Sequence, residues 1–254
     1  MNILFIGDVF GKSGRQIVKK ELPQIIKDNN LNLIIANVEN ICHGKGTRQK
    51  DIDFLKGLGV EVFTGGNHTF DNPEILDIFK KETTVLRPAN YPKSVPGNGY
   101  CIHKNTLVIN LMGRVFIKEG MDSPFDTADK ILEENKNKKF DAIIVDIHAE
   151  TTSEKSALFH YLNGRVSAVV GTHTHIQTAD EKVSKQGTAF ITDVGMTGPE
   201  DSIIGMDKDI VLKKFLTGMP VKMEPATGKA LFCGILIEME NKRSKSIKRI
   251  MIRE

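Results

Sequence analysis

The chain of 254 residues has little cysteine, no tryptophan and no long apolar run. Its three cysteines, Cys42, Cys101 and Cys233, are far apart and form no CxxC pair, which argues against both a disulfide framework and a thiolate zinc site. No apolar run approaches the ~18 residues that a membrane-spanning helix needs. The N-terminus runs straight into an apolar strand without a basic segment or a cleavage site. We therefore expect no signal peptide, no membrane partner and a cytoplasmic location.

An excess of charge of one sign is also missing. Lys and Arg number 35 against 32 Asp and Glu, a net charge of +3. That surplus is too small for a protein that tracks a nucleic-acid backbone, so we expect no nucleic-acid partner. The basic residues near the C-terminus alternate with Ile247, Ile250 and Ile252, a pattern typical of a solvated edge strand. With 40% hydrophobic residues, a chain of this length can bury a core without disulfides or structural metal ions.

Short apolar strands alternate with helical patterns along most of the chain. Strands are predicted at residues 3–6, 31–38, 60–64, 141–147, 166–170, 189–192 and 231–239, with two more inside 100–112. Helices are predicted at 14–27, 49–58 and 127–135, with one opened by Pro73 and one by the capping-box pair Thr151 and Glu154. Because the strands are apolar throughout, helices should cover the central sheets. The sequence thus predicts one layered α/β domain over residues 1–254, with a small irregular insertion near 87–122.

Polar side chains follow five of the predicted strands, at the point where each strand ends. They are Asp8, Glu39 with Asn40, Asn67 with His68, His148, and the pair His173 and His175. Ligands of α/β proteins collect at this edge of the sheet. Each residue alone has an ordinary structural interpretation, such as a cap, a turn or a buried imidazole, but five coincidences together are improbable. The two imidazoles of the pair are two residues apart, so in an extended segment they would point the same way.

This set of carboxylates, amides and imidazoles contains no thiolate, which suits manganese, iron or zinc. It offers too many ligands for one tetrahedral ion and about enough for two. Two ions about 3.5–4 Å apart that share a carboxylate form the clamp used in phosphate-ester cleavage.

The ordered motifs resemble those of the calcineurin-like metallophosphoesterases. They are Gly7-Asp8, Gly66-Asn67-His68, His148 and Gly171-Thr172-His173-Thr174-His175. More narrowly, the whole chain resembles the YmdB-like branch of that superfamily, which is associated with cyclic-nucleotide phosphodiesterase activity. The stretches that carry this likeness are residues 38–40, 44–47, 148–155, 171–180 and 191–199. The resemblance implies a metallophosphoesterase-like fold and a small-molecule phosphodiester as substrate.

The resemblance also implies a ligand set for two metal ions, with iron or manganese favoured and zinc the alternative. One ion would be held by Asp8, Glu39, Asn40 and His175, and the other by Glu39, Asn67, His148 and His173. A hydroxide bridging the two ions would attack the phosphorus of a cyclic nucleotide. The 2′,3′-cyclic nucleotides are the substrate class that the resemblance favours. The wider superfamily begins with Asp-x-His, whereas Val9 and Phe10 follow Asp8 here. Glu39 replaces the usual bridging aspartate, and Asn40 fills the place of the missing imidazole.

His68 receives no metal in this scheme. It would sit beside the substrate and donate a proton or a hydrogen bond to the leaving ribose oxygen, a contribution typically worth ~10²–10⁴ in rate. The alternative is that His68 only orients Asn67.

Two other functions remain open from the sequence. The first is a non-catalytic protein that senses a metal or a nucleotide. The second is a P-loop NTPase, suggested by Gly7, Gly11, Lys12 and Ser13 with Asp146 as a magnesium partner. The P-loop needs four residues between its glycines and this segment has three. The sequence is compatible with a homo-oligomer.

Overall fold

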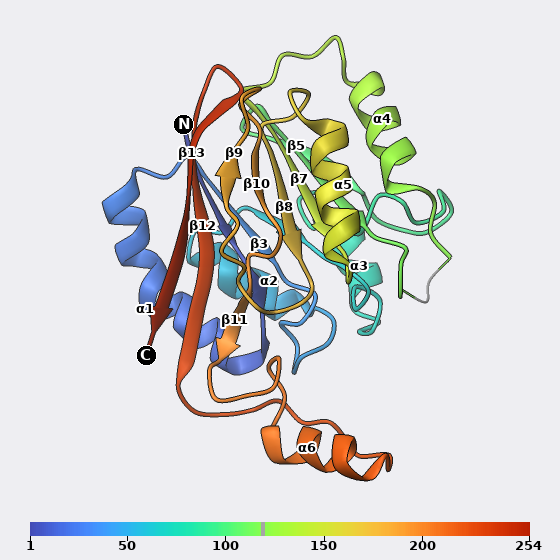
Figure 1. The fold of residues 1–254 in the computed structure, drawn as a ribbon, viewed down its shortest axis with the longest axis vertical. Coiled ribbons are helices and arrows are strands. Elements are labelled where there is room, and N and C mark those ends of the chain that lie inside the picture. The colour runs from blue at the N-terminus through green and yellow to red at the C-terminus, as the bar shows by residue number, and fades with distance from the viewer. Residues whose placement is uncertain (118–119) are drawn as a thin grey trace.

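The computed structural model describes residues 1–117 and 120–254, which form two β-sheets packed face to face with helices on both outer sides (Figure 1). The seven-stranded first sheet has the order β2-β11-β12-β1-β3-β4, with β13 paired to β12. The six-stranded second sheet has the order β5-β6-β7-β8-β10-β9. The parallel strands β1, β3 and β4 of the first sheet, and β6, β7, β8 and β10 of the second, lie next to one another.

The strands of the first sheet are β1 (Asn2–Ile6), β2 (Asp8–Val9), β3 (Leu33–Asn37), β4 (Val62–Thr64), β11 (Met196–Pro199), β12 (Ala230–Glu240) and β13 (Arg243–Arg253). Those of the second are β5 (Tyr100–His103), β6 (Thr106–Met112), β7 (Ala142–His148), β8 (Ala168–Thr172), β9 (Lys182–Val183) and β10 (Ala189–Ile191). The helices are α1 (Gly11–Asn29), α2 (Gln49–Gly57), α3 (Ile75–Lys81), α4 (Pro124–Glu134), α5 (Thr152–Leu162) and α6 (Lys208–Thr217).

The core is layered because the central strands are apolar on both faces. In β1, Leu4 and Ile6 pack with α1, α2 and α3 on the outer side of the first sheet. The alternate residues Ile3 and Phe5 lie in the core between the two sheets. On the outer side of the second sheet, strand residues such as Ile109 pack with α4 and α5. The predicted layered α/β fold, with both sheets covered by helices, is confirmed.

Most predicted elements are present, with shifted ends. The helix predicted from residue 127 begins at Pro124, because Pro occupies the first helical turn and the Ser123 hydroxyl accepts from the amide of Asp126. The helix expected at Pro73 begins two residues later, at Ile75. The C-terminal edge strand is confirmed as β13, which pairs only with β12 among the described strands.

The segment 87–122 is irregular only in part. Its strands β5 and β6 are the two predicted within 100–112, and β6 pairs in parallel with β7, so these strands belong to the second sheet. The irregular portions are the chain before β5 and the chain after β6. Residues 118–119 of this segment lie outside the described residues. No described helix has the length and apolarity that crossing a bilayer requires.

Gly7 allows β2 to form. Its amide donates to the carbonyl of Cys233, and a Cβ placed on it would lie 1.9 Å from the carbonyl oxygen of Gly195. The neighbouring Asp8 amide donates to that same Gly195 carbonyl at 3.0 Å, and Asp8 is paired in parallel with Met196. The segment that suggested a P-loop therefore contains a short strand, not a loop that wraps a phosphate.

We predict that Gly7→Ala lowers the free energy of unfolding by about 1–3 kcal/mol or more, because the added methyl group meets backbone that cannot move aside. Gly57→Ala is the matched control: this helical glycine has nothing within 4 Å of an added Cβ. That change should stabilise the chain by about 0.4–1 kcal/mol. Urea unfolding of both variants measures the difference, and equal midpoints would show that Gly7 has room for a side chain.

Candidate metal centre

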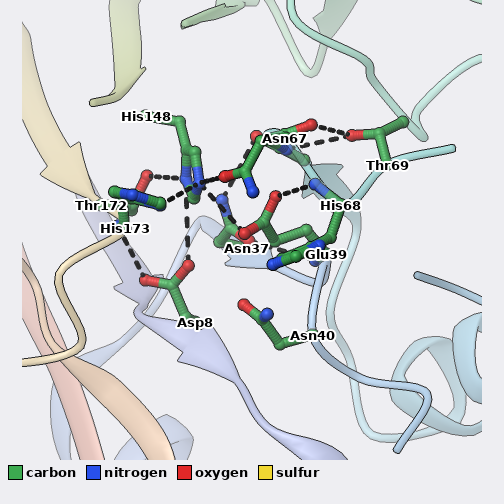
Figure 2. A network of polar contacts seen from close by, with 12 residues as sticks. Asp8, Asn37, Glu39, Asn40, Asn67, His68, Thr69, His148, Thr172 and His173 are labelled. Atoms are coloured by element: carbon green, nitrogen blue, oxygen red, sulfur yellow. Dashed lines mark hydrogen bonds and ion pairs between the residues drawn. The ribbon is translucent and has the colours of Figure 1, made fainter. Parts of the chain in front are cut away.

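The predicted site residues come together at the carboxyl ends of the strands (Figure 2). Asp8 lies in β2, Glu39 and Asn40 follow β3, and Asn67 and His68 follow β4, all in the first sheet. His148 ends β7, and His173 and His175 follow β8, in the second sheet. The site is therefore built from both sheets, at the edge where β1, β3 and β4 face β7 and β8.

His148 is the centre of one group of contacts. Its Nε2 atom lies 3.0 Å from each of three atoms on other elements: Glu39 Oε1, Asn67 Oδ1 and His173 Nδ1. Glu39 and His148 are almost fully buried. Glu39, His148 and His173 offer ligand atoms that all lie within 4.8 Å of one another, which is a spacing that one metal ion can bridge. Four side chains of three residue types thus direct an oxygen or a nitrogen at one point.

A second group lies beside the first. His175 Nε2 is 3.3 Å from Asn40 Oδ1, and the Asn40 amide group is oriented by donation from its nitrogen to the carbonyl of Gly44 at 3.0 Å. Asp8 is completely buried, and its Oδ1 has no hydrogen-bond partner among the described residues. Its other oxygen accepts from the His173 amide, at 3.3 Å. A buried carboxylate oxygen without a donor is costly unless a cation satisfies it, so the donor set fits a metal ion.

The electrostatics of the site favour cations. Burial raises the pKa of Glu39, but His148 and His68 together outweigh it and the net pKa falls to about 2. Burial lowers the pKa of His148, but Glu39 and Asp8 together raise it to about 9. Burial, reinforced by His148, lowers the pKa of His173 to about 3, so that ring is neutral. Burial also raises the pKa of Asp8. The proton held by His148 marks the place where a metal ion would bind and displace it.

Each of the three imidazoles directs one ring nitrogen toward the centre of the site. Its other ring nitrogen lies within hydrogen-bond distance of a protein oxygen. His148 Nδ1 lies 2.9 Å from the Thr172 hydroxyl, and His175 Nδ1 lies 2.9 Å from the carbonyl oxygen of Ile204. His173 Nε2 lies 2.9 Å from a carboxylate oxygen of Glu150. Such partners fix the tautomer and the orientation of metal-binding histidines. The nitrogens left for a metal are Nε2 of His148 and His175 and Nδ1 of His173.

The segment that carries His173 and His175 is not extended, so the expectation that their rings point the same way is wrong. Both residues have positive φ, 107° and 66°. His173 is directed toward His148 and His175 toward Asn40, one in each group of contacts. Non-glycine residues in these conformations need support from their surroundings.

That support comes from a buried ion pair. The Asp193 carboxylate accepts from the amide and the hydroxyl of Thr174, the residue between the two histidines, at 2.9 and 2.7 Å. Lys155 Nζ lies 2.8 Å from the same carboxylate oxygen, and both side chains are fully buried. The ion pair therefore joins helix α5 to residues 173–175, which we call the histidine loop.

His68 lies at the rim of the site. Its amide donates to Glu39 Oε2 at 2.9 Å, and its ring Nδ1 lies 2.8 Å from the Asp71 carboxylate. Nε2 is then the nitrogen that can reach a substrate. Two partners were not predicted from the sequence: Asp71, which contacts His68, and Glu150, which contacts His173. Both could have been found from their positions in the sequence. Asp71 follows His68 by three residues, and Glu150 follows His148 by two.

The family of YmdB-like proteins matches residues 4–250 of the chain. The chain belongs to this family. A 2′,3′-cyclic-nucleotide 2′-phosphodiesterase of Bacillus subtilis is 45% identical over an alignment of 260 residues that covers 100% of the chain and 98% of that relative. A putative phosphatase/phosphodiesterase of Mycoplasma genitalium is 36% identical and is covered over 92% of its length, again by the whole chain.

A solved structure extends the family likeness to three dimensions. The crystal structure of a novel phosphatase from Mycoplasma pneumoniae superposes with a TM-score of 0.94 at 34% identity, covering 100% of the chain and 93% of that protein. The YmdB-like chain is therefore a phosphoesterase enzyme with a metallophosphoesterase-type fold.

We predict that Lys155→Met lowers the free energy of unfolding by about 3–5 kcal/mol, because it leaves the buried Asp193 carboxylate without its counterion. The matched control is Lys80→Met, which removes an ion pair of the same 2.8 Å length whose side chains are 73% and 71% exposed. The control should leave the midpoint of urea unfolding unchanged. Similar midpoints for both variants would show that the buried pair does not stabilise the histidine loop.

Proposed function

We propose that the chain is a dinuclear metal-dependent phosphodiesterase that hydrolyses cyclic nucleotides, with the 2′,3′-cyclic class as its substrates. The convergence of Glu39, Asn67 and His173 on one nitrogen of His148 carries the proposal. These four side chains come from the ends of four different strands, and each is of a type that ligates metal ions. A phosphoesterase needs such a point, because phosphoryl transfer depends on positioning and charge stabilisation.

The contacts around His148 and the contact of His175 with Asn40 support two ligand sets. Glu39, Asn67, His148 and His173 would hold one ion, and Asp8, Asn40 and His175 would hold the other, with the Glu39 carboxylate shared. Bound cations would supply Lewis-acid activation of the phosphodiester and of the attacking water. The absence of thiolate ligands favours iron or manganese, with zinc as the alternative. The buried oxygen of Asp8 without a donor and the low pKa of Glu39 support this assignment.

The chain's own residues supply the remaining requirements. Asp71 orients the ring of His68 through Nδ1, so that Nε2 can donate to the leaving ribose oxygen. The name of the Bacillus subtilis relative supports a 2′,3′-cyclic substrate, in which the leaving group is an unactivated sugar oxygen. That leaving group gives a chemical reason for an acid at this position.

Metal analysis joined to a hydrolysis screen tests this function. The metal-free chain should bind two Mn²⁺ ions and then hydrolyse 2′,3′-cyclic nucleotides faster than 3′,5′-cyclic nucleotides, linear diesters or monoesters. Glu39→Gln should abolish activity and lower metal content, because one neutral amide oxygen cannot bridge two cations. Glu240→Gln, which changes a 63% exposed carboxylate, is the control and should change neither quantity.

Two results would contradict the proposal. Full activity with one metal ion or none would rule out the dinuclear mechanism. Binding of metal and nucleotide without any turnover would instead favour the alternative, a regulatory protein that senses its ligands.

His68 allows binding and chemistry to be separated. We predict that His68→Ala keeps both metal ions but lowers kcat on a 2′,3′-cyclic nucleotide by roughly 10²–10⁴. The loss should be much smaller on an aryl phosphodiester with a nitrophenolate leaving group, because that oxygen needs little protonation. His160→Ala, on the exposed side of α5, is the control for loss of an imidazole outside the site. Equal losses on both substrates would leave His68 a positioning role only.

A further inference from the structure

The carboxylate of Asp146 is completely buried between the two sheets and lies outside both proposed ligand sets. Donors from three other strands surround it. The Thr172 hydroxyl of β8 donates to Oδ1 at 2.8 Å. The Thr64 hydroxyl of β4 donates to Oδ2 at 2.5 Å, and the Asn37 side-chain nitrogen of β3 lies 3.4 Å from the same oxygen. Asp146 itself lies in β7, so one carboxylate connects four strand ends, two from each sheet.

We propose that Asp146, acting through Thr172, is the positioning residue that fixes the orientation of His148 in the metal centre. This inference rests on the proposed function, because it assigns Asp146 a role in holding a metal ligand. Asp146 and His148 are two residues apart on one strand, so their side chains lie on the same face of the sheet. The Thr172 hydroxyl lies between them (Figure 2 shows Thr172 beside the His148 ring).

The direction of the hydrogen bonds decides how the ring is used. The Thr172 hydroxyl has one proton, which it donates to Asp146. Its oxygen therefore accepts from Nδ1–H of His148, 2.9 Å away. Nε2 is then the nitrogen that faces Glu39, Asn67 and His173 with a free electron pair once a metal ion replaces its proton. Without the hydroxyl, the buried ring would lose the partner that selects this tautomer.

Asp146 also reaches Glu39 on the opposite sheet. Asn37 links the two: its side-chain oxygen accepts from the Glu39 amide at 3.1 Å, while its nitrogen faces Asp146. Glu39 and His148 approach to 3.0 Å across the gap between the sheets. The same buried carboxylate is therefore linked to both, which holds ligands from different sheets in a common geometry.

Paired substitutions of the hydroxyl donors test the role with Co²⁺ as the probe. Thr172→Val keeps the side-chain shape and removes the hydroxyl, and it should weaken one of the two Co²⁺ sites by about 10–100-fold. Thr172→Ser restores the hydroxyl and should recover most of that affinity. Thr64→Val is the matched control: it removes an equally buried hydroxyl that donates to the other oxygen of the same carboxylate, Oδ2. It should leave both Co²⁺ affinities within a few-fold of the wild type.

Competition with a chelator gives the affinities, and the visible absorption of bound Co²⁺ reports the coordination of each site. Urea unfolding without metal compares the stability of the two valine variants. Two results would overturn this inference while leaving the proposed function intact. The first is that Thr172→Val binds two Co²⁺ ions with wild-type affinity. The second is that Thr64→Val loses as much affinity as Thr172→Val. A wild-type chain that binds no Co²⁺ would contradict the proposed function and this inference with it.

Discussion

The contact between Glu39 and His148 is the interaction on which the rest of the site depends. Two side chains that are almost fully excluded from water meet at 3.0 Å, one from each sheet. Such a pair is costly to bury unless its charges are compensated. The neighbouring groups provide that compensation: the His68 amide on one carboxylate oxygen and the Thr172 hydroxyl on the far ring nitrogen. The geometry of the centre follows from satisfying this pair, and a cation among the same atoms would satisfy it further.

The sandwich architecture explains why the ligands come from distant parts of the chain. Parallel strands β1, β3 and β4 end at the edge where β7 and β8 of the facing sheet also end. Apolar residues between the sheets fix the distance that separates them. Buried hydrogen bonds then set how the ligand residues of one sheet lie relative to those of the other. The Lys155–Asp193 pair extends this principle to the histidine loop, where two left-handed residues are held in conformations that the local sequence does not favour.

Much of the fold could be predicted because its signals are local. Continuous apolar runs such as 33–37 and 142–148 mark strands covered on both faces, and polar residues at their ends mark the site. The pairing of β2 with β11 could not be predicted, since two residues carry no periodicity and the pairing depends on Gly195 approaching Gly7. Helix α6 was missed for a similar reason: it has only one buried residue, Val211, so its apolar pattern follows no core-facing stripe.

The candidate ligands could be named from strand ends and motif order, but their division between two groups came from the family resemblance and not from spacing. Spacing alone predicted parallel imidazoles for His173 and His175, whereas positive φ at both positions sends them to different partners. The role of Asp146 needed the facing sheet, because Thr64 and Asn37 are far from it in sequence.

Anomalous diffraction from crystals grown with Mn²⁺ tests the central claim most directly. We expect two anomalous peaks about 3.5–4 Å apart, with the Glu39 carboxylate in contact with both and His148 Nε2 in contact with one. A single peak, or peaks that Glu39 does not bridge, would contradict it.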